Sequence, residues 1–400
     1  MVRVLGSAFV RMSEIFAEYR MSSQSDSKPA RVLVADDQPD VLEALRWLLT
    51  GEGYEPEFVS STAEVMACLE AESFDLLLMD LNYTRDTTSG REGLELIPRV
   101  RAQDGTLPIV VMTGWGSIDT AVEAMRRGAK SFVQKPWEDV TLLEILAREI
   151  AEARAARRRD QKQQREVEEA SLIQRGLLPT AIPQVGGVQL AVAWQPVYGV
   201  GGDCFDTLAF DQVLGISIAD IAGKGLPAAL LMSNLQAAVR AFAQESTSPS
   251  SICTSVNRLL CRNMAPGRFA TFCYARIDVG NGRIRYSNAG HNPPLLVRAN
   301  GDVEKLSGGG MVLGVFPDIA YEQVELRLQP KDRLIFYTDG ISEALDSNGE
   351  EYGDDRLAEA AARARSLDAT SLKDALLNEV TEFADGKFQD DATLIVAGLP

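Results

Sequence analysis

The chain has 400 residues, 46% of them hydrophobic and 24% charged, proportions typical of a soluble globular protein with two ordinary domains. Its formal net charge of −17 disfavours nucleic acid as a partner, because DNA binding needs a cationic face. No apolar run approaches the ~20 residues of a membrane helix, so we expect no membrane segment. The five cysteines form no CxxC pair or His/Cys cluster, which indicates buried free thiols and a cytoplasmic location.

Residues 30–147 show the alternation of a doubly wound α/β domain, after residues 1–29, where we expect a disordered tail. Continuous apolar strands separated by amphipathic helices are typical of a parallel sheet covered on both faces, with its active site at the carboxyl ends of the strands. The apolar runs lie at 31–35, 76–79, 107–112 and 131–133, and the helical patterns at 41–49, 63–69, 93–100 and 118–127.

One long helix is predicted at 137–178, because no proline and no glycine interrupts the segment before Gly176. We expect its part at 148–180 to be a helical linker. A two-stranded coiled coil between protomers would make the protein a homodimer, although the seam has few large apolar residues. The alternative is a solvated spacer helix with i,i+4 ion pairs.

Residues 181–400 have a different pattern, in which strands arrive in blocks between helices. Such blocks predict an α+β layered domain. The predicted strands are 188–194, 213–220, 269–279, 283–287, 324–328, 333–337 and 392–397, and the predicted helices are 227–243, 252–264 and 371–384.

Polar side chains follow the strands of the first domain. Asp36 and Asp37 end the first strand, Asp80 follows the run 76–79, Thr113 ends 107–112, and Lys135 follows 131–133. Three carboxylates at one sheet edge would repel each other, so the pattern predicts a Mg²⁺ site. Asp80 would then attack a phosphoryl group, Lys135 would neutralise the developing charge, and the Thr113 hydroxyl would bond the phosphoryl oxygens.

These residues and spacings resemble the CheY-like receiver family. The resemblance implies Asp80 as the phosphoacceptor, with Asp37, Asp80 and the Asn82 carbonyl as magnesium ligands and Asp36 acting through water. It also implies Phe132 as the switch aromatic and a sensor histidine kinase as the phosphodonor. The loop from Asp80 to Gly93 is longer than is usual in the family, which puts the lifetime of the aspartyl phosphate in doubt.

Four acidic motifs stand at strand ends in the second domain. Carboxylates beside glycines at strand ends are suited to a two-metal pocket, because glycine allows close backbone approach and two metals activate a bridging water. The motifs are Gly201-Gly202-Asp203-Cys204-Phe205-Asp206, Ala219-Asp220-Ile221-Ala222-Gly223-Lys224-Gly225, Tyr337-Thr338-Asp339-Gly340 and Asp390-Asp391-Ala392-Thr393.

The order of these motifs resembles the metal-dependent protein phosphatases of the PPM or 2C type, in their RsbU/SpoIIE-like branch. The resemblance implies a β-sandwich flanked by helices and two Mn²⁺ or Mg²⁺ ions. Asp220 would bridge both ions, the Ile221 carbonyl would hold one, Asp339 and Asp390 would hold the other, and Asp203 would be an outer ligand through water. The implied substrate is a phosphorylated anti-anti-sigma (STAS-type) protein.

Several roles stay open. Asp206 and Asp391 are interpreted as indirect supports, His291 as a structural residue that holds a loop, and Cys204 has no functional account. No particular basic residue can be assigned to the substrate phosphate.

Three alternatives compete with the interpretation of a receiver that controls a serine/threonine phosphatase. The first is a phosphorylation-gated scaffold in which an inactive phosphatase fold sequesters a partner. Such a scaffold predicts gaps among the metal carboxylates, which the sequence does not show. A diguanylate cyclase would need Glu where Cys204 stands, and a DNA-binding regulator would need a basic helix-turn-helix segment.

Overall fold

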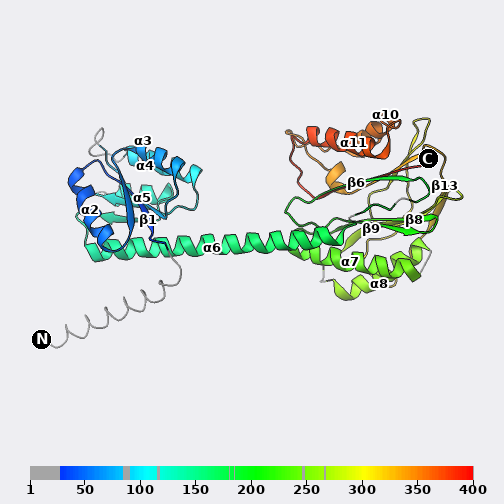
Figure 1. The fold of residues 1–400 in the computed structure, drawn as a ribbon, viewed down its shortest axis with the longest axis horizontal. Helices are drawn as coiled ribbons and strands as arrows, with labels where there is room; N and C mark the ends of the chain where they lie inside the picture. The colour runs from blue at the N-terminus through cyan, green and yellow to red at the C-terminus, as the bar shows by residue number, and fades with distance from the viewer. Residues whose placement is uncertain are drawn as a thin grey trace. The chain divides into compact units, whose positions relative to one another are not determined.

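The computed structural model describes residues 28–83, 91–114, 118–179, 181–183, 185–245, 248–264 and 267–399. The expected tail at 1–29 therefore lies almost wholly outside the described residues. The chain forms two compact units, 1–163 and 164–400, whose boundary falls within helix α6 (Asp139–Leu177), close to the predicted 137–178 (Figure 1). No helix in the described part of the chain is long and apolar enough to cross a membrane.

The first unit contains a five-stranded parallel sheet in the order β2-β1-β3-β4-β5, as the predicted doubly wound fold requires. Its strands are β1 (Arg31–Ala35), β2 (Glu55–Val59), β3 (Leu76–Asp80), β4 (Ile109–Thr113) and β5 (Ser131–Gln134). Its helices are α2 (Pro39–Gly51), α3 (Thr62–Ala71), α4 (Arg91–Gln103), α5 (Ile118–Arg126) and the first part of α6.

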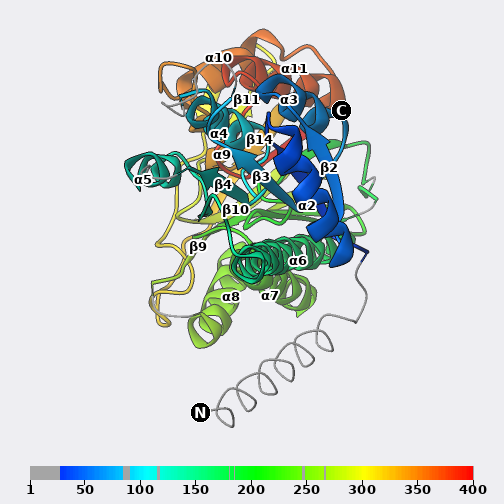
Figure 2. The ribbon, with the colours of Figure 1, turned by 90° about the vertical axis from the view of Figure 1, so that its left-hand side faces the viewer.

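Both faces of this sheet are buried, because successive strand residues point to opposite sides. Val32 and Val34 pack with Leu45 of α2 and Leu142 of α6, whereas Leu33 belongs to a second core on the other face, against α3 and α4. Figures 1 and 2 show α2 and α6 on one side of the sheet and α3 and α4 on the other. Polar side chains can therefore lie in the loops after the strands, at the edge of the sheet where the parallel strands end.

Strand β2 is the element that the sequence analysis missed in this unit. Its sequence Glu-Pro-Glu-Phe-Val has only one fully buried residue, Val59, and lacks an apolar run. It lies at the edge of the sheet, where proline is tolerated because one side of the strand needs no partner.

The second unit is a sandwich of two five-stranded sheets whose strand pairs are antiparallel. One sheet has the order β13-β10-β9-β8-β7 and the other β12-β11-β14-β15-β6. The strands are β6 (Gln189–Gln195), β7 (Cys204–Phe210), β8 (Val213–Ile221), β9 (Ala270–Asp278), β10 (Arg283–Ala289), β11 (Leu295–Val297), β12 (Val303–Lys305), β13 (Val324–Arg327), β14 (Arg333–Tyr337) and β15 (Ala392–Gly398).

Helices cover the outer faces of this sandwich. On β14, Leu334 and Phe336 point into the core that also holds the first sheet, whereas Ile335 and Tyr337 point to the opposite core under α10 and α11. Figure 1 shows α7 and α8 below the sheets and α10 and α11 above them, which confirms the predicted α+β class. The helices are α7 (Leu226–Glu245), α8 (Pro249–Asn263), the short α9 (Asp339–Ser342), α10 (Asp354–Arg363) and α11 (Ala369–Phe383).

The sequence analysis missed the strands β7, β11 and β12 and the helices α9 and α10. Strands β11 and β12 have three residues each, too few to show the two-residue period of a strand. Strand β7 contains two polar residues that are buried, the acidic Asp206 and the hydroxyl residue Thr207.

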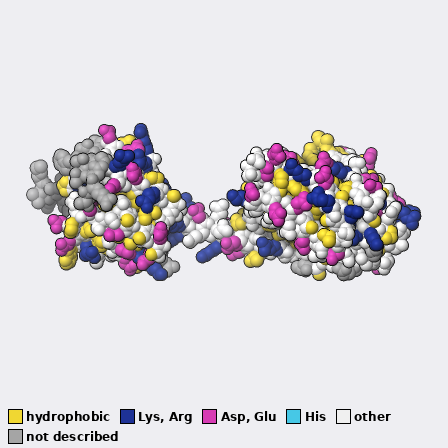
Figure 3. All heavy atoms as spheres, turned by 90° about the horizontal axis from the view of Figure 1, so that it is seen from above, with side chains coloured by type: hydrophobic (Ala, Val, Ile, Leu, Met, Phe, Trp, Pro, Cys, Tyr) yellow, Lys and Arg dark blue, Asp and Glu magenta, His cyan; other side chains and the backbone are white. Residues whose placement is uncertain are grey.

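All five cysteines are free, but Cys68 and Cys261 are only half-buried, contrary to the expectation of burial throughout. On the face drawn in Figure 3, basic and acidic side chains are interspersed.

Candidate functional site

The first unit brings its predicted site residues together at one sheet edge. Asp36 follows β1, Asp80 and Thr113 are the last residues of β3 and β4, and Lys135 follows β5. The carboxylates of Asp36, Asp37 and Asp80 offer oxygens that all lie within 4.8 Å of one another. Such an oxygen-rich group fits a hard divalent ion such as Mg²⁺.

Lys135 is the cation inside this cluster. Its Nζ lies 2.6 Å from Asp36 Oδ2 and 2.8 Å from Asp80 Oδ2. Burial raises the pKa of Asp36, although the hydrogen bond from Lys135 opposes the shift. Burial alone would lower the pKa of Lys135, but the two carboxylates outweigh it and raise this pKa. Lys135 therefore stays charged and holds two of the three carboxylates in place.

The remaining residues of this site differ in exposure. Thr113 is buried, and its carbonyl accepts a hydrogen bond from Lys135 N at 2.7 Å. Asn82 is half-buried, whereas Phe132 on β5 is 47% exposed and thus free to change rotamer. The long loop expected after Asp80 includes residues 84–90, which lie outside the described residues.

The second unit gathers its acidic motifs from both sheets. Asp220 is near the end of β8, Asp339 begins α9 directly after β14, and Asp390 precedes β15. Burial, followed by the charges of Asp339 and Asp390, raises the pKa of Asp220 to about 7. Burial and Asp390 also raise the pKa of Asp339. These carboxylates, distant along the chain, therefore share one negative potential, which a divalent cation would neutralise.

Asp203 lies deeper than the other three. Its Oδ2 accepts hydrogen bonds from Thr338 Oγ1 at 2.7 Å and Thr393 Oγ1 at 2.6 Å, and its Oδ1 is buried without a partner among the described residues. Burial and the charge of Asp220 raise the pKa of Asp203 well above its usual value. An unpartnered carboxylate oxygen of this kind fits a water or an ion at the site.

Two glycines bring the backbone against this cluster. A Cβ on Gly202 would lie 2.8 Å from the Ile221 carbonyl oxygen and 3.3 Å from Asp220 Oδ1. A Cβ on Gly340 would lie 2.1 Å from the Asp391 carbonyl oxygen. Both glycines are therefore required by close packing around the candidate ligands.

The residues left open by the sequence have identifiable contacts. Asp206 pairs with Arg240 at 2.5 Å, so its carboxylate faces a cation and not the cluster. Asp391 accepts hydrogen bonds from the backbone N–H groups of Val197 and Gly202, both at 2.8 Å. His291 is buried with Nδ1 2.7 Å from the hydroxyl of Thr271, and burial lowers its pKa to about 4. Asp391 and Asp206 thus fix the chain around the cluster.

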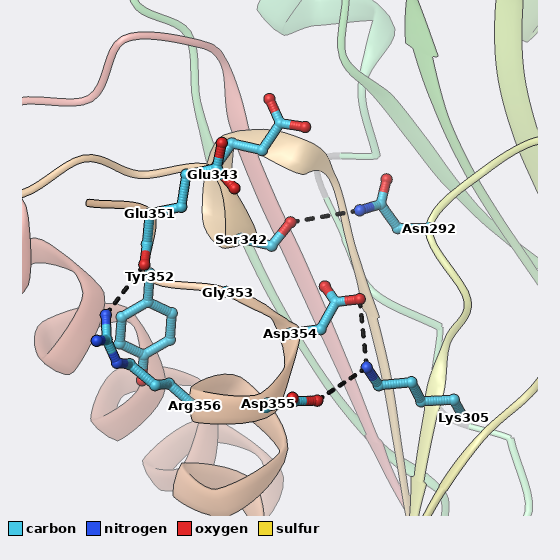
Figure 4. A pocket seen from close by; sticks show the side chains of 10 residues that line it. All are labelled: Asn292, Lys305, Ser342, Glu343, Glu351, Tyr352, Gly353, Asp354, Asp355 and Arg356. Atoms are coloured by element: carbon cyan, nitrogen blue, oxygen red, sulfur yellow. Dashed lines mark hydrogen bonds and ion pairs between the residues drawn. The ribbon is translucent and has the colours of Figure 1, made fainter. Parts of the chain in front are cut away.

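A pocket of about 550 Å³ lies beside the end of α9, the helix that begins with Asp339 (Figure 4). Two of the residues that line it, Ser342 and Glu343, are the last residue of α9 and the residue that follows the helix. Burial, followed by the charges of Asp339 and Glu351, raises the pKa of Glu343. On the opposite wall, Lys305 pairs with Asp355 at 3.1 Å.

The end of α6 contacts the same region. Gln174, which is buried, donates through Nε2 to Gly201 O at 2.7 Å and accepts from Gly201 N at 3.0 Å. The Leu177 carbonyl accepts a hydrogen bond from Gln236 Nε2 at 2.9 Å. The sequence analysis assigned no role to Gln174, because a glutamine in a charged helix gives no local signal of burial.

Comparison with known proteins agrees with this division of the chain. Residues 32–147 match the response regulator receiver domain, and residues 211–400 match Stage II sporulation protein E (SpoIIE). The SpoIIE match includes Asp220, Asp339 and Asp390 but begins after Asp203.

Individual relatives cover the second unit. Protein IcfG of Synechocystis sp. is 29% identical over 259 residues, 58% of this chain and 41% of IcfG. Phosphoserine phosphatase RsbU of Bacillus subtilis is 28% identical over 232 residues, 58% of this chain and 69% of RsbU. The chain thus spans less than half of IcfG. The SiaA-PP2C domain of Pseudomonas aeruginosa, 23% identical with a TM-score of 0.54 over 60% of this chain and 98% of that domain, shares the fold.

Proposed function

We propose that phosphorylation of Asp80 controls a metal-dependent protein phosphatase, because residues 32–147 match the response regulator receiver domain and residues 211–400 match Stage II sporulation protein E (SpoIIE). The reaction would be hydrolysis of phosphoserine or phosphothreonine on a partner protein. The observation that carries the proposal is the convergence of Asp220, Asp339 and Asp390: burial, followed by the charges of the other two carboxylates, raises the pKa of Asp220 to about 7.

The proposed metal ligands of the phosphatase are those that the motifs predicted. Asp220, the Ile221 carbonyl, Asp339 and Asp390 would hold two Mn²⁺ or Mg²⁺ ions, and Asp203 would act through water. Such ions supply an activated water and neutralise phosphoryl charge. The protein's own contribution is positioning: Thr338 and Thr393 fix Asp203, and Asp391 fixes the Gly202 backbone.

In the receiver, the proposed phosphodonor is a sensor histidine kinase and the proposed ion is Mg²⁺. Asp37, Asp80 and the Asn82 carbonyl are the proposed ligands, and Asp36 acts through water. Lys135, 2.8 Å from Asp80 Oδ2, is positioned to bond the phosphoryl group on Asp80. Thr113 would bond another phosphoryl oxygen, with Phe132 as the switch aromatic.

Helix α6 is the proposed connection between the two activities. Its first turns bury Leu142 and Leu146 in the receiver core, and its last turns bond Gly201 through Gln174. Gly201 precedes Gly202 and Asp203 of the metal cluster, so a shift of the helix end would move the backbone beside the proposed ligands. Phosphoryl switches act by biasing such two-state elements.

The proposed substrate is an anti-anti-sigma protein of the STAS type, and the pocket beside Glu343 would receive the chain around its phosphoresidue. The similarity to RsbU, a phosphoserine phosphatase, supports phosphoserine as the group that is hydrolysed. We also propose a homodimer through α6. Leu172 and Ile173 on that helix are 73% and 68% exposed, and a second copy of the helix would bury them.

The phosphatase is tested by hydrolysis of p-nitrophenyl phosphate with Mn²⁺ and with chelator. We expect metal-dependent turnover in the wild type and a loss of at least about 100-fold in Asp220→Ala and Asp339→Ala, because each substitution removes a ligand. Asp374→Ala, which removes an exposed carboxylate on α11, is the matched control. Absence of metal-dependent turnover, with intact binding of a phosphoprotein, would favour the scaffold.

Control by the receiver is tested separately. Beryllofluoride or acetyl phosphate is expected to raise turnover of the wild type, and Asp80→Asn is expected to remove that response while basal hydrolysis persists. Equal turnover with and without beryllofluoride in the wild type would contradict regulation by Asp80 without affecting the phosphatase assignment.

A further inference from the structure

Lys224, in the loop that follows strand β8, points its ammonium group at the carboxylates proposed to bind metal, namely Asp203, Asp220, Asp339 and Asp390. Lys224 Nζ lies 2.9 Å from Asp390 Oδ2 and donates a hydrogen bond to the Gln389 carbonyl oxygen, also at 2.9 Å. Of the ion pairs formed by described residues, this is the one that joins a cation to Asp203, Asp220, Asp339 or Asp390. The charge of Lys224 also acts on Asp339, whose pKa it lowers against the dominant effect of burial.

The backbone of this loop is held so that the lysine keeps its direction. Gly223 and Gly225 flank Lys224 with φ angles of +116° and +72°, which side chains rarely adopt. Arg268 Nη1 donates to the Ala222 carbonyl oxygen at 2.6 Å, and a Cβ on Gly223 would lie 1.5 Å from that nitrogen. Arg268 therefore fixes the backbone of the loop, whereas the ammonium group of Lys224 contacts the carboxylate cluster.

Exposure shows what the ammonium group can reach. The Lys224 side chain is 44% exposed, and so is the side chain of Asp390. The pair therefore stands at the solvent side of a cluster whose deepest member, Asp203, is buried. A phosphate group that approaches the cluster from solvent passes this side first.

We propose that Lys224 binds a phosphoryl oxygen of the substrate, which deepens the proposed function and rests on it. A phosphomonoester carries about two negative charges and meets several carboxylates here, so it needs positive charge beyond the two ions. A lysine ammonium is a compact point charge that binds phosphate without a fixed geometry. When Asp390 binds a metal ion, its partner Lys224 can turn to a phosphoryl oxygen held beside the same ion.

The 2.9 Å pair with Asp390 adds a second consequence. An ammonium group at that distance competes with a metal ion for the same carboxylate. Removing it is expected to leave Mn²⁺ affinity equal or higher, whereas affinity for phosphate falls. A residue with a merely structural role would not separate these two affinities in this way.

The test compares Lys224→Met with the wild type, using the full chain loaded with Mn²⁺. Inorganic phosphate binding by calorimetry and KM for a phosphoserine peptide are both expected to weaken by roughly 10- to 100-fold, the value of a charged hydrogen bond. Mn²⁺ binding, measured without phosphate, is expected to be unchanged or tighter. Lys224→Arg should retain much of the phosphate affinity, and Lys373→Met, which removes a lysine on α11, should retain all of it.

Unchanged phosphate affinity in Lys224→Met would overturn the inference. A parallel loss of Mn²⁺ affinity and melting temperature would also overturn it, because Lys224 would then be a structural anchor for the loop. Absence of turnover in the wild type would count against the proposed phosphatase, whereas the phosphate calorimetry would still decide the role of Lys224.

Discussion

Replacing Gly202 with alanine is predicted to weaken Mn²⁺ binding by the second unit. The added Cβ would lie 2.8 Å from the Ile221 carbonyl oxygen, whereas ordinary contacts begin at 3.4 Å, so the atoms must separate by at least 3.4 − 2.8 = 0.6 Å. Metal–ligand distances are held to about 0.2 Å, so a shift of this size removes or distorts a ligand. Loss of support around a metal site costs roughly 10- to 100-fold in metal affinity, and we expect a reduction in that range.

The assay is a calorimetric Mn²⁺ titration of the wild type and Gly202→Ala. Gly202 does not have a positive φ, so alanine is not strained by its own backbone, and its N–H bond to Asp391 can persist. Gly176→Ala is the matched control, because no atom lies within 4 Å of its added Cβ. Equal Mn²⁺ affinity in a folded Gly202→Ala protein would refute the assignment of the Ile221 carbonyl and Asp220 as ligands.

Two further predictions concern side-chain contacts of α6. Gln174→Leu leaves the buried N–H and carbonyl of Gly201 without partners, so urea unfolding of the second unit is expected to show a loss of about 1–3 kcal/mol, and an unchanged midpoint would contradict this. In the first unit, burial opposes ionisation of Asp75, but hydrogen bonds from Arg154 and Arg31 outweigh it and lower its pKa. The stability that this provides is present above the unfolded pKa of about 3.9 and is lost as pH falls through the lower folded value. The melting temperature of Asp75→Asn should therefore lie below that of the wild type at pH 7 and converge with it in acid, whereas a constant difference would argue against an ionic contribution.

Much of the receiver could be predicted because its signals are local. Each of its predicted strands is a continuous apolar run, and the polar residue that follows the run is placed at the site by the parallel topology alone. Strand β2 escaped because an edge strand buries little and has no such run. A sheet can therefore be predicted from the apolar runs of its central strands even where the sequence gives no signal for an edge strand.

The second unit could be predicted less completely, because its contacts join residues far apart in sequence. The aspartates were identified from their motifs, but the two partners of Asp203 lie more than 130 positions away: Thr338 directly follows β14, and Thr393 is on β15. Periodicity carries no information about such pairs. The pairing of Asp206 with Arg240 has the same origin, and only the folded arrangement of β7 and α7 distinguishes it from a metal ligand.

The two lysines at the carboxylate clusters show why sequence position alone cannot assign a role. Lys135 and Lys224 both lie just beyond the end of a strand, and each approaches aspartates distant along the chain. Lys135 is 17% exposed and bonds two carboxylates, so its charge is largely used within the protein. Lys224 is 44% exposed and contacts one carboxylate at the solvent side. Its ammonium group can therefore leave that carboxylate for a ligand at a smaller cost in free energy. Exposure and the number of fixed partners, which depend on the tertiary fold, therefore distinguish these two lysines, and they make Lys224 the one that we propose to bind a phosphate group arriving from solvent.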